Sequence, residues 1–276
     1  MATTLMFSVC GSPGITTAAV AATRRWYRNS ILLEADTSRA SAVLSGYLKG
    51  TVTGKKSLIN LAVAAAQAGH IDYNDMWAQL HPLDSDNVQD AQQWVLPGLM
   101  DPKSAPSLDH LWGDIISGAD TFESAGTDVI IDAGRWNVGD VRSALMRSAD
   151  AVVLVARPTM PDAFAVRSRL EDIRATLGEI GHSDHLSILT VEKPGTEYPP
   201  TKVASSLGLR LIGSLPWDDK CASVFSDGAH ITNSGRFEKR PYIKAVDSLV
   251  ETLHQDLDRR RSLLNEALDN EVEELS

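Results

Sequence analysis

Short apolar runs, separated by amphipathic stretches, recur along most of this chain. Six of these runs are almost continuously hydrophobic, at 4–9, 30–35, 128–133, 151–156, 186–191 and 209–215. Strands that are buried on both faces have this pattern, whereas a strand with one solvated face alternates apolar and polar residues. The pattern therefore predicts six central strands of a buried sheet.

Helical patterns lie between the predicted strands, with apolar residues three and four positions apart. They cover 15–28, 139–149, 161–178, 200–207 and the chain from 241 onward. Strands that alternate with helices in this way form a mostly parallel sheet with helices on both faces. We therefore predict an α/β fold of that architecture, with a C-terminal helix.

Residues 47–125 break this alternation. The segment contains helical patterns and one short strand candidate, at 93–98. We interpret 93–98 as a further strand of the sheet and the remainder as a mainly helical covering of one face. The three tryptophans of this segment are expected in the core or at its rim, rather than in a ligand cage.

The chain ends in a long helical pattern. Its leucines recur four residues apart up to Leu257, and the apolar stripe resumes at Leu264. All charged residues after Ser262 are acidic, unlike those of helices that lie on membranes. We predict one sheet-based domain over 1–255 and an acidic helix over 256–276, which either docks on the domain or pairs with a second copy.

Charge and composition narrow the function classes. The 276 residues carry a net charge of −10, which repels nucleic acid and anionic lipid. Basic clusters at 24–28 and 259–261 are interpreted as solvated helix surface, with a local DNA or partner patch as the alternative. The start of the chain lacks the basic region of a signal peptide, and two cysteines make no disulfide framework. We therefore expect a cytoplasmic protein with no membrane partner.

A glycine-rich turn joins the first predicted strand to the first predicted helix. Residues 9–17 read VCGSPGITT. A turn that opens a helix in this way presents backbone N–H groups to phosphate oxygens. The Walker A pattern, G-x-x-x-x-G-K-[ST], would place its lysine at Ile15. The turn thus has the spacing of a phosphate-binding loop without its lysine.

The loop resembles more closely the deviant Walker A loop of the MinD/ParA family of P-loop ATPases, K-G-G-x-G-K-T-T, which overlays residues 10–17. Further landmarks of that family follow in the same order: an acidic pair after the second strand, an aspartate that ends a later strand, a strand that ends in proline, and a turn. They fall at Glu34 and Asp36, at Asp132, at 149–158 and at 213–218. The resemblance covers roughly residues 3 to 250 and implies the P-loop NTPase fold.

The resemblance also implies a role for each matching residue. Thr16 resembles the hydroxyl that binds Mg²⁺ directly, and Asp132 resembles the carboxylate that reaches Mg²⁺ through water. Asp36 resembles the catalytic carboxylate that orients the attacking water. The expected nucleotide-binding residues are Gly11, Ser12, Gly14, Ile15, Thr16 and Thr17.

Two departures from the family pattern change the expected activity. The positions of the two lysines hold Cys10 and Ile15. Each lost charge-assisted contact is worth ~1.5–3 kcal/mol, so the pair would lower nucleotide affinity about a hundred- to ten-thousandfold. ATP and Mg²⁺ are therefore expected to bind weakly or not at all. Arg39, just after Asp36, is a surface arginine by default, and a substitute cation in the alternative.

The resemblance implies three functions that the residues leave open. The first is a pseudo-ATPase adaptor or regulator, similar to the Tad-pilus-associated ParA-like proteins of actinobacteria, with a protein partner in a positioning, pilus/secretion or partitioning assembly. The second is an active ATP-dependent switch that forms a homodimer. The third, DNA partitioning through a basic face, is disfavoured by the net charge of −10.

Simpler interpretations remain for several of these residues. In the simpler interpretation, Gly11 and Gly14 only permit close packing of the strand against the helix. Cys10 at the start of a helix is a candidate nucleophile, but no histidine lies near it in sequence. His182 and His185 are three residues apart, and we interpret them as an exposed polar turn rather than a metal site.

Overall fold

A single sheet organises the part of the chain that the structure describes. The computed structural model describes residues 2–11, 13–52, 55–84, 90–120, 122, 126–178, 185–196 and 198–274. The strands are β1 (Thr3–Ser8), β2 (Ser30–Glu34), β3 (His81–Pro82), β4 (Gln93–Leu96), β5 (Asp128–Arg135), β6 (Ala151–Ala156), β7 (Leu186–Val191) and β8 (Arg210–Leu215). Their order in the sheet is β3-β4-β2-β5-β1-β6-β7-β8, and all neighbours are parallel except β3 and β4.

The predicted α/β architecture is confirmed. All six apolar runs form strands, and the short candidate at 93–98 is β4. Only β3 was not predicted, because two residues that include Pro82 carry no strand pattern. Proline is tolerated there because β3 is an edge strand.

The helices differ more from the prediction. They are α1 (Ile15–Arg24), α2 (Leu58–Ala68), α3 (Tyr73–Ala78), α4 (Trp112–Asp120), α5 (Ser143–Ser148), α6 (Met160–Arg167), α7 (Leu170–Gly178), α8 (Pro200–Leu207), α9 (Asp219–Ser226), α10 (Ser234–Phe237) and α11 (Pro241–Glu274), with a π-helical turn at Val43–Tyr47 and a 3₁₀ turn at Pro102–Leu108. The prediction of one helix over 161–178 is wrong, because the chain breaks into α6 and α7.

The first helix also ends earlier than the predicted residue 28. It stops at Arg24, where Arg25 leaves helical geometry with φ −106° and ψ 4°. The next residue, Trp26, turns inward, and its Nε1 donates to the buried carboxylate of Asp128 at 2.9 Å. Burial of this indole outweighs one more helical turn.

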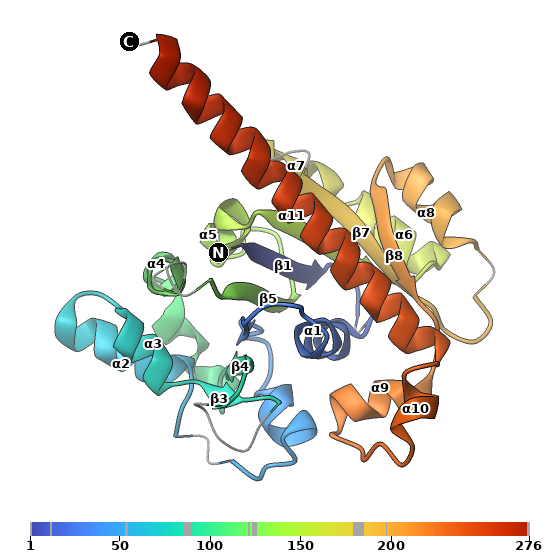
Figure 1. Ribbon diagram of the computed structural model, residues 1–276, viewed down its shortest axis with the longest axis horizontal. Helices are drawn as coiled ribbons and strands as arrows, with labels where there is room; N and C mark the ends of the chain where they lie inside the picture. The colour runs from blue at the N-terminus through green and yellow to red at the C-terminus, as the bar shows by residue number, and fades with distance from the viewer. Residues whose placement is uncertain are drawn as a thin grey trace.

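Helices cover both faces of the sheet (Figure 1). On β1, Leu5 and Phe7 contribute to one hydrophobic cluster and Met6 to the other, as the alternation of strand side chains requires. The first cluster contains buried residues of α2 to α8, and the second contains those of α1, α9 and α11. The tryptophans at 94 and 112 are buried, which confirms their expected place in the core.

The last helix crosses the second face of the sheet and then extends beyond the body of the molecule (Figure 1). Leu249, Leu253 and Leu257 are buried in the second cluster, so this part of the helix is docked on the domain. The helix runs unbroken through residue 255. The side chains at Leu264 and in the acidic stretch lie outside the described residues. No described helix has both the length and the apolar character that a membrane crossing requires.

Candidate functional site

The glycine-rich loop leaves β1 at Ser8 and enters α1 at Ile15. Gly14 precedes the helix with φ +94°, a left-handed conformation that glycine adopts without strain. The first turn of α1 has no acidic residue, so its unpaired N–H groups and positive dipole end attract anions. Ser12, one of the expected nucleotide-binding residues, lies outside the described residues.

A cavity of about 320 Å³ opens at this helix start. It is lined by Cys10, Gly11, Pro13, Gly14, Ile15, Thr16, Thr17, Asp36, Ser38, Arg39, Gly134 and Arg135. These residues come from the loop after β1, the first turn of α1 and the carboxyl ends of β2 and β5, and the three strands are neighbours in the sheet. Ligands of open parallel sheets bind at such an edge.

Thr16, which lines this cavity, contacts Asp132, which is fully buried beside it. The Thr16 hydroxyl donates to Asp132 Oδ2, and the backbone N–H of Gly134 donates to Asp132 Oδ1 at 3.0 Å. Full burial raises the pKa of Asp132 to about 7, although these two hydrogen bonds act in the opposite direction. The structure thus brings together the two residues expected to hold Mg²⁺.

Asp36 lies beside them, almost fully buried. Its Oδ1 accepts from the N–H and the hydroxyl of Ser38 at 3.0 and 2.6 Å, and its Oδ2 accepts from Arg39 Nε at 3.0 Å. Gly134 permits this position, since a Cβ there would lie 2.2 Å from Asp36 Cγ. The carboxylate expected to orient a water molecule therefore has local donors on both oxygens.

Arg39 is not the plain surface arginine expected by default. Its Nη2 donates to the Thr16 hydroxyl at 2.5 Å, and its side chain lines the cavity while remaining 49% exposed. The alternative weighed from the sequence, a cation close to the phosphate loop, agrees with this placement. Only the spacing of three residues after Asp36 pointed to it in the sequence.

Both positions at which the family loop carries lysine are packed into the core. Cys10 is 5% exposed and Ile15 is 7% exposed, and they belong to opposite hydrophobic clusters. Burial and the nearby Asp162 raise the pKa of the Cys10 thiol to about 12. The thiol is therefore protonated at neutral pH, which removes the chemical basis for a nucleophilic role.

The donor set does not fit Mg²⁺ in this arrangement. Carboxylate and hydroxyl oxygens are ligands that Mg²⁺ accepts. However, the Thr16 hydroxyl already donates to Asp132 and accepts from Arg39, whose positive charge stands where a cation would contact Thr16. Among the described residues, no group of three or more histidine, cysteine or acidic side chains is arranged to hold a metal ion.

Glu34, the first member of the expected acidic pair, has a structural role. Its buried carboxylate accepts from the Ser41 hydroxyl and from the N–H groups of Ala42 and Gly98, so it joins the turn after β2 to the end of β4. It does not line the cavity.

Arg142, which the sequence analysis missed, fixes the strand ends beneath the site. Its buried guanidinium donates to the carbonyls of Ala35, Ala133 and Arg135 and pairs with Asp140 at 2.7 Å. It thereby ties the end of β2 to the end of β5. No sequence motif identified it, because its partners are backbone carbonyls.

A second cavity, of about 450 Å³, adjoins the first and shares Pro13, Gly14 and Thr17 with it. Its walls include Val191 and Leu215, the last residues of β7 and β8, and Trp217, which follows β8. Arg157 also lines it, and its Nη1 donates to the Gly11 carbonyl at 3.3 Å. Together the two cavities offer a polar end at the helix start and a more apolar end beside it.

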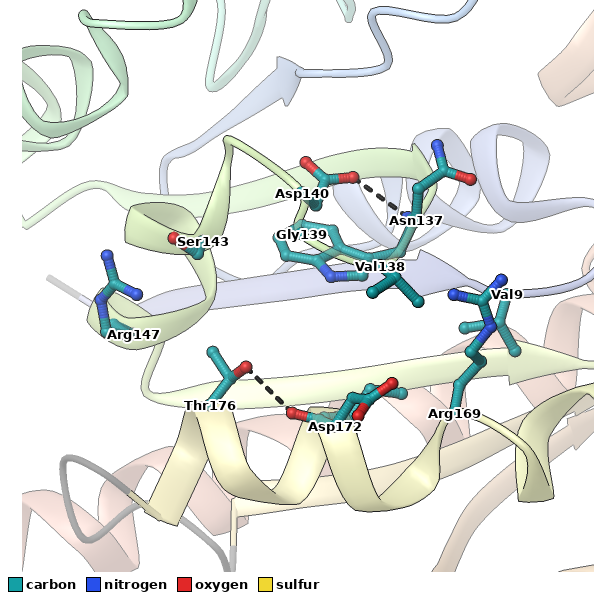
Figure 2. Close-up of a pocket in the computed structure, with 12 residues that line it drawn as sticks. Val9, Asn137, Val138, Gly139, Asp140, Ser143, Arg147, Arg169, Asp172 and Thr176 are labelled. Atoms are coloured by element: carbon teal, nitrogen blue, oxygen red, sulfur yellow. Dashed lines mark hydrogen bonds between the residues drawn. The ribbon is translucent and has the colours of Figure 1, made fainter.

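A third cavity, of about 340 Å³, lies behind the loop between α5 and α7 (Figure 2). It shares none of the lining residues of the first cavity. Arg147 and Arg169 lie toward opposite ends of it, with Val138 between them (Figure 2). Asp140, on its rim, is already neutralised by Arg142.

The basic cluster at 24–28 is engaged within the fold. Arg24 donates to Gln93, Arg25 pairs with Asp247 at 2.6 Å, and Arg28 pairs with Asp258 at 2.9 Å. Of the two histidines weighed as a metal site, His182 lies outside the described residues.

By sequence, no protein-family model and no curated protein matches the chain. Solved structures match it by fold. A chain of the MinC:MinD cell division complex of Aquifex aeolicus is 14% identical with a TM-score of 0.68, and the match covers 92% of this chain and 96% of that one. A ParA family ATPase from Chlorobium tepidum is 11% identical with a TM-score of 0.68, covering 90% and 98%.

A third similar structure is the septum site-determining protein MinD of Pyrococcus horikoshii, complexed with Mg-ADP. It is 14% identical with a TM-score of 0.61, and the match covers 91% of this chain and 96% of that chain. At such identities the similarity establishes the fold, which is that of the MinD/ParA P-loop NTPases.

Proposed function

We propose that this chain is a ParA/MinD-like pseudo-ATPase: an adaptor or regulator that keeps a phosphate cradle, holds a nucleotide weakly and does not turn it over. One observation carries the proposal. The two lysine positions of the family loop are Cys10 and Ile15, both buried in the core, whereas Thr16 and Asp36 line the cavity and the buried Asp132 contacts Thr16. The geometry of a cradle is thus present without its two usual cations.

The state of Asp36 supports the absence of turnover. A carboxylate that orients an attacking water needs a free lone pair directed at that water. Three of the roughly four lone-pair sites of Asp36 instead accept hydrogen bonds from Ser38 and Arg39, which leaves at most one for a water. Two missing lysine contacts would each cost ~1.5–3 kcal/mol of binding free energy, which favours loose binding.

The proposed context is a positioning, pilus/secretion or partitioning assembly with a protein partner. The fold neighbours include a MinC:MinD complex and a structure described as a plasmid partition protein, which makes a macromolecular partner the natural expectation. Under this proposal the chain, as a monomer or a homodimer, binds its partner through a ParA-like surface. Weak binding of a nucleotide in the cradle alters that surface. DNA is a disfavoured partner because of the net charge of −10.

A second candidate function is an active ATP-dependent dimerisation switch. It is favoured by the contact of Thr16 with Asp132, and by the adjoining cavity of about 450 Å³, which has room for a nucleoside. In that case ATP would bind tightly, be hydrolysed, and promote dimer formation.

Equilibrium dialysis with ATP, combined with a phosphate-release assay, separates the two. We expect dissociation constants of ~0.1–1 mM, raised further by Thr16→Ala, and no phosphate release above the blank. Thr252→Ala, a change at a half-buried threonine of α11 that lines neither cavity, is the matched control. Micromolar retention with turnover that Thr16→Ala abolishes would overturn the pseudo-ATPase proposal in favour of the switch.

A further inference from the structure

Arg39 occupies an unusual place for an arginine in a turn. It follows β2 by five residues, and its guanidinium reaches across to the first turn of α1. One end of the guanidinium contacts the Asp36 carboxylate at 3.0 Å, and the other contacts the Thr16 hydroxyl at 2.5 Å. The side chain thus bridges the end of β2 and the phosphate loop.

The guanidinium still has donors to offer. Arginine carries five N–H groups, of which one binds Asp36 and one binds Thr16. The other three have no acceptor among the described residues, on a side chain that is 49% exposed and lines the cavity. A planar, permanently charged group with several free donors is suited to phosphate oxygens.

The Arg39 guanidinium also lies where a P-loop protein would hold Mg²⁺. Thr16 and Asp132 form the oxygen pair from which a P-loop protein would hold Mg²⁺, and Asp36 lies beside them. Here the Arg39 guanidinium contacts Thr16 of this pair and the neighbouring Asp36 carboxylate. A divalent cation at this pair would meet a positive charge already seated there.

We propose that Arg39 takes the place of both the loop lysines and the divalent metal, so that this cradle binds a phosphate-bearing ligand without Mg²⁺. The inference rests on the proposed function, because it concerns the same cavity. It adds the identity of the cationic residue and the metal requirement. The ligand class is a polyphosphate, bound by the guanidinium on one side and by the N–H groups at the start of α1 on the other.

Isothermal titration of the full chain with ATP and with inorganic pyrophosphate tests this, each in excess EDTA and in Mg²⁺. We expect the affinity of the unmodified chain to change less than about threefold between the two conditions. Arg39→Ala should weaken binding of both ligands about 10- to 100-fold, as loss of a charged hydrogen-bonding partner does. Arg39→Lys should recover only part of this loss, because one ammonium cannot contact Asp36, Thr16 and phosphate together.

Arg169→Ala is the matched control, since Arg169 is a partly buried arginine that lines a different cavity. It should leave both affinities unchanged. If Arg39→Ala fails to fold, as shown by loss of cooperative thermal unfolding, Arg39→Gln keeps the stem and two N–H donors, and its affinity decides the question.

Two results would overturn the inference while leaving the weakly binding cradle intact: binding that requires Mg²⁺, or binding that Arg39→Ala and Arg39→Gln leave unchanged. A different result, no binding of either ligand in either condition, would contradict the cradle itself and with it the nucleotide-holding part of the proposed function.

Discussion

Gly134 determines where Asp36 can lie. Its φ is +57°, and a Cβ at this position would lie 2.2 Å from Asp36 Cγ and 2.4 Å from Asp36 Oδ2. Asp36 cannot move aside freely, because Ser38 and Arg39 hold both of its oxygens. The absence of a side chain at Gly134 therefore allows the Asp36 carboxylate to lie at the cavity.

We expect Gly134→Ala to lower the free energy of unfolding by about 2–4 kcal/mol. About 1 kcal/mol comes from the left-handed backbone, and the remainder comes from displacing a buried carboxylate. Urea unfolding followed by circular dichroism measures it. Gly139→Ala is the control, because Gly139 has φ +65° with nothing within 4 Å of its Cβ position. Equal losses in the two variants would show that contact with Asp36 is unimportant.

Individual site residues were predictable to different degrees. Thr16 and Asp132 could be named because the loop before α1 and the strand β5 resemble the corresponding parts of the MinD/ParA pattern, and the structure brings the two residues into contact. Glu34 was named by the same logic, but its partners, the Ser41 hydroxyl and two backbone N–H groups, make it structural. The reach of Arg39 depends on a side-chain conformation, which spacing along the chain does not specify.

At the scale of elements, buried strands were the most predictable. A run such as 151–156 is apolar at every position because both of its faces are covered, and this leaves little ambiguity. Helix α8 was predicted with its observed bounds, since Pro200 begins it and Gly208 ends it with φ +62°. The four-residue α10 was missed, because one turn carries too few apolar positions to show a period, and α9, which is as long as α8, was missed as well.

The contact between α11 and α1 contains a buried histidine. The His254 ring stacks on Tyr27 with centroids 4.9 Å apart and also contacts Trp26, and its Nε2 has no partner within the described residues. Burial, and then the nearby Arg28, lower the pKa of His254, although Asp128 and Asp258 act in the opposite direction. Protonation is therefore easier in the unfolded chain than in the folded one.

From this we predict a stability loss on mild acidification. When the pH falls below about 6.5, His254 becomes protonated in the unfolded chain but stays neutral in the folded one. The free energy of unfolding therefore falls by up to ~1.4 kcal/mol per pH unit until the pKa of folded His254 is reached. His254→Phe keeps the stacking and should show a shallower decline between pH 7.5 and 5.5. Urea unfolding at several pH values measures both curves.

His230→Gln, a change at an exposed histidine, controls for the loss of a histidine as such and should keep the slope of the unmodified chain. His81, whose pKa is also lowered by burial and by Lys56, is present in every variant and cancels in the comparison. Parallel curves for the unmodified chain and His254→Phe would contradict the claim that His254 causes the loss of stability on acidification.

At the scale of the whole molecule, the distribution of charge limits the choice of partner. The net charge is −10, and the arginines that looked like a basic patch in the sequence are used to attach α1 to its surroundings. Arg25 alone contacts Asp247 at 2.6 Å and Glu238 at 2.9 Å. A phosphate backbone would have to compete with these carboxylates for the same guanidinium groups.

We therefore predict that the chain does not bind duplex DNA appreciably, even in 50 mM salt, where non-specific binding is strongest. Phosphate contacts by several basic side chains give ordinary DNA-binding proteins non-specific dissociation constants of ~10⁻⁴–10⁻⁶ M at physiological salt, and much tighter ones at low salt. Fluorescence anisotropy of a labelled duplex should show no saturable rise up to ~100 µM protein. Saturable binding that falls steeply with salt, and that Arg259→Gln/Arg260→Gln/Arg261→Gln removes, would instead identify the start of the protruding part of α11 as a DNA-binding segment. It would return partitioning to the candidate functions.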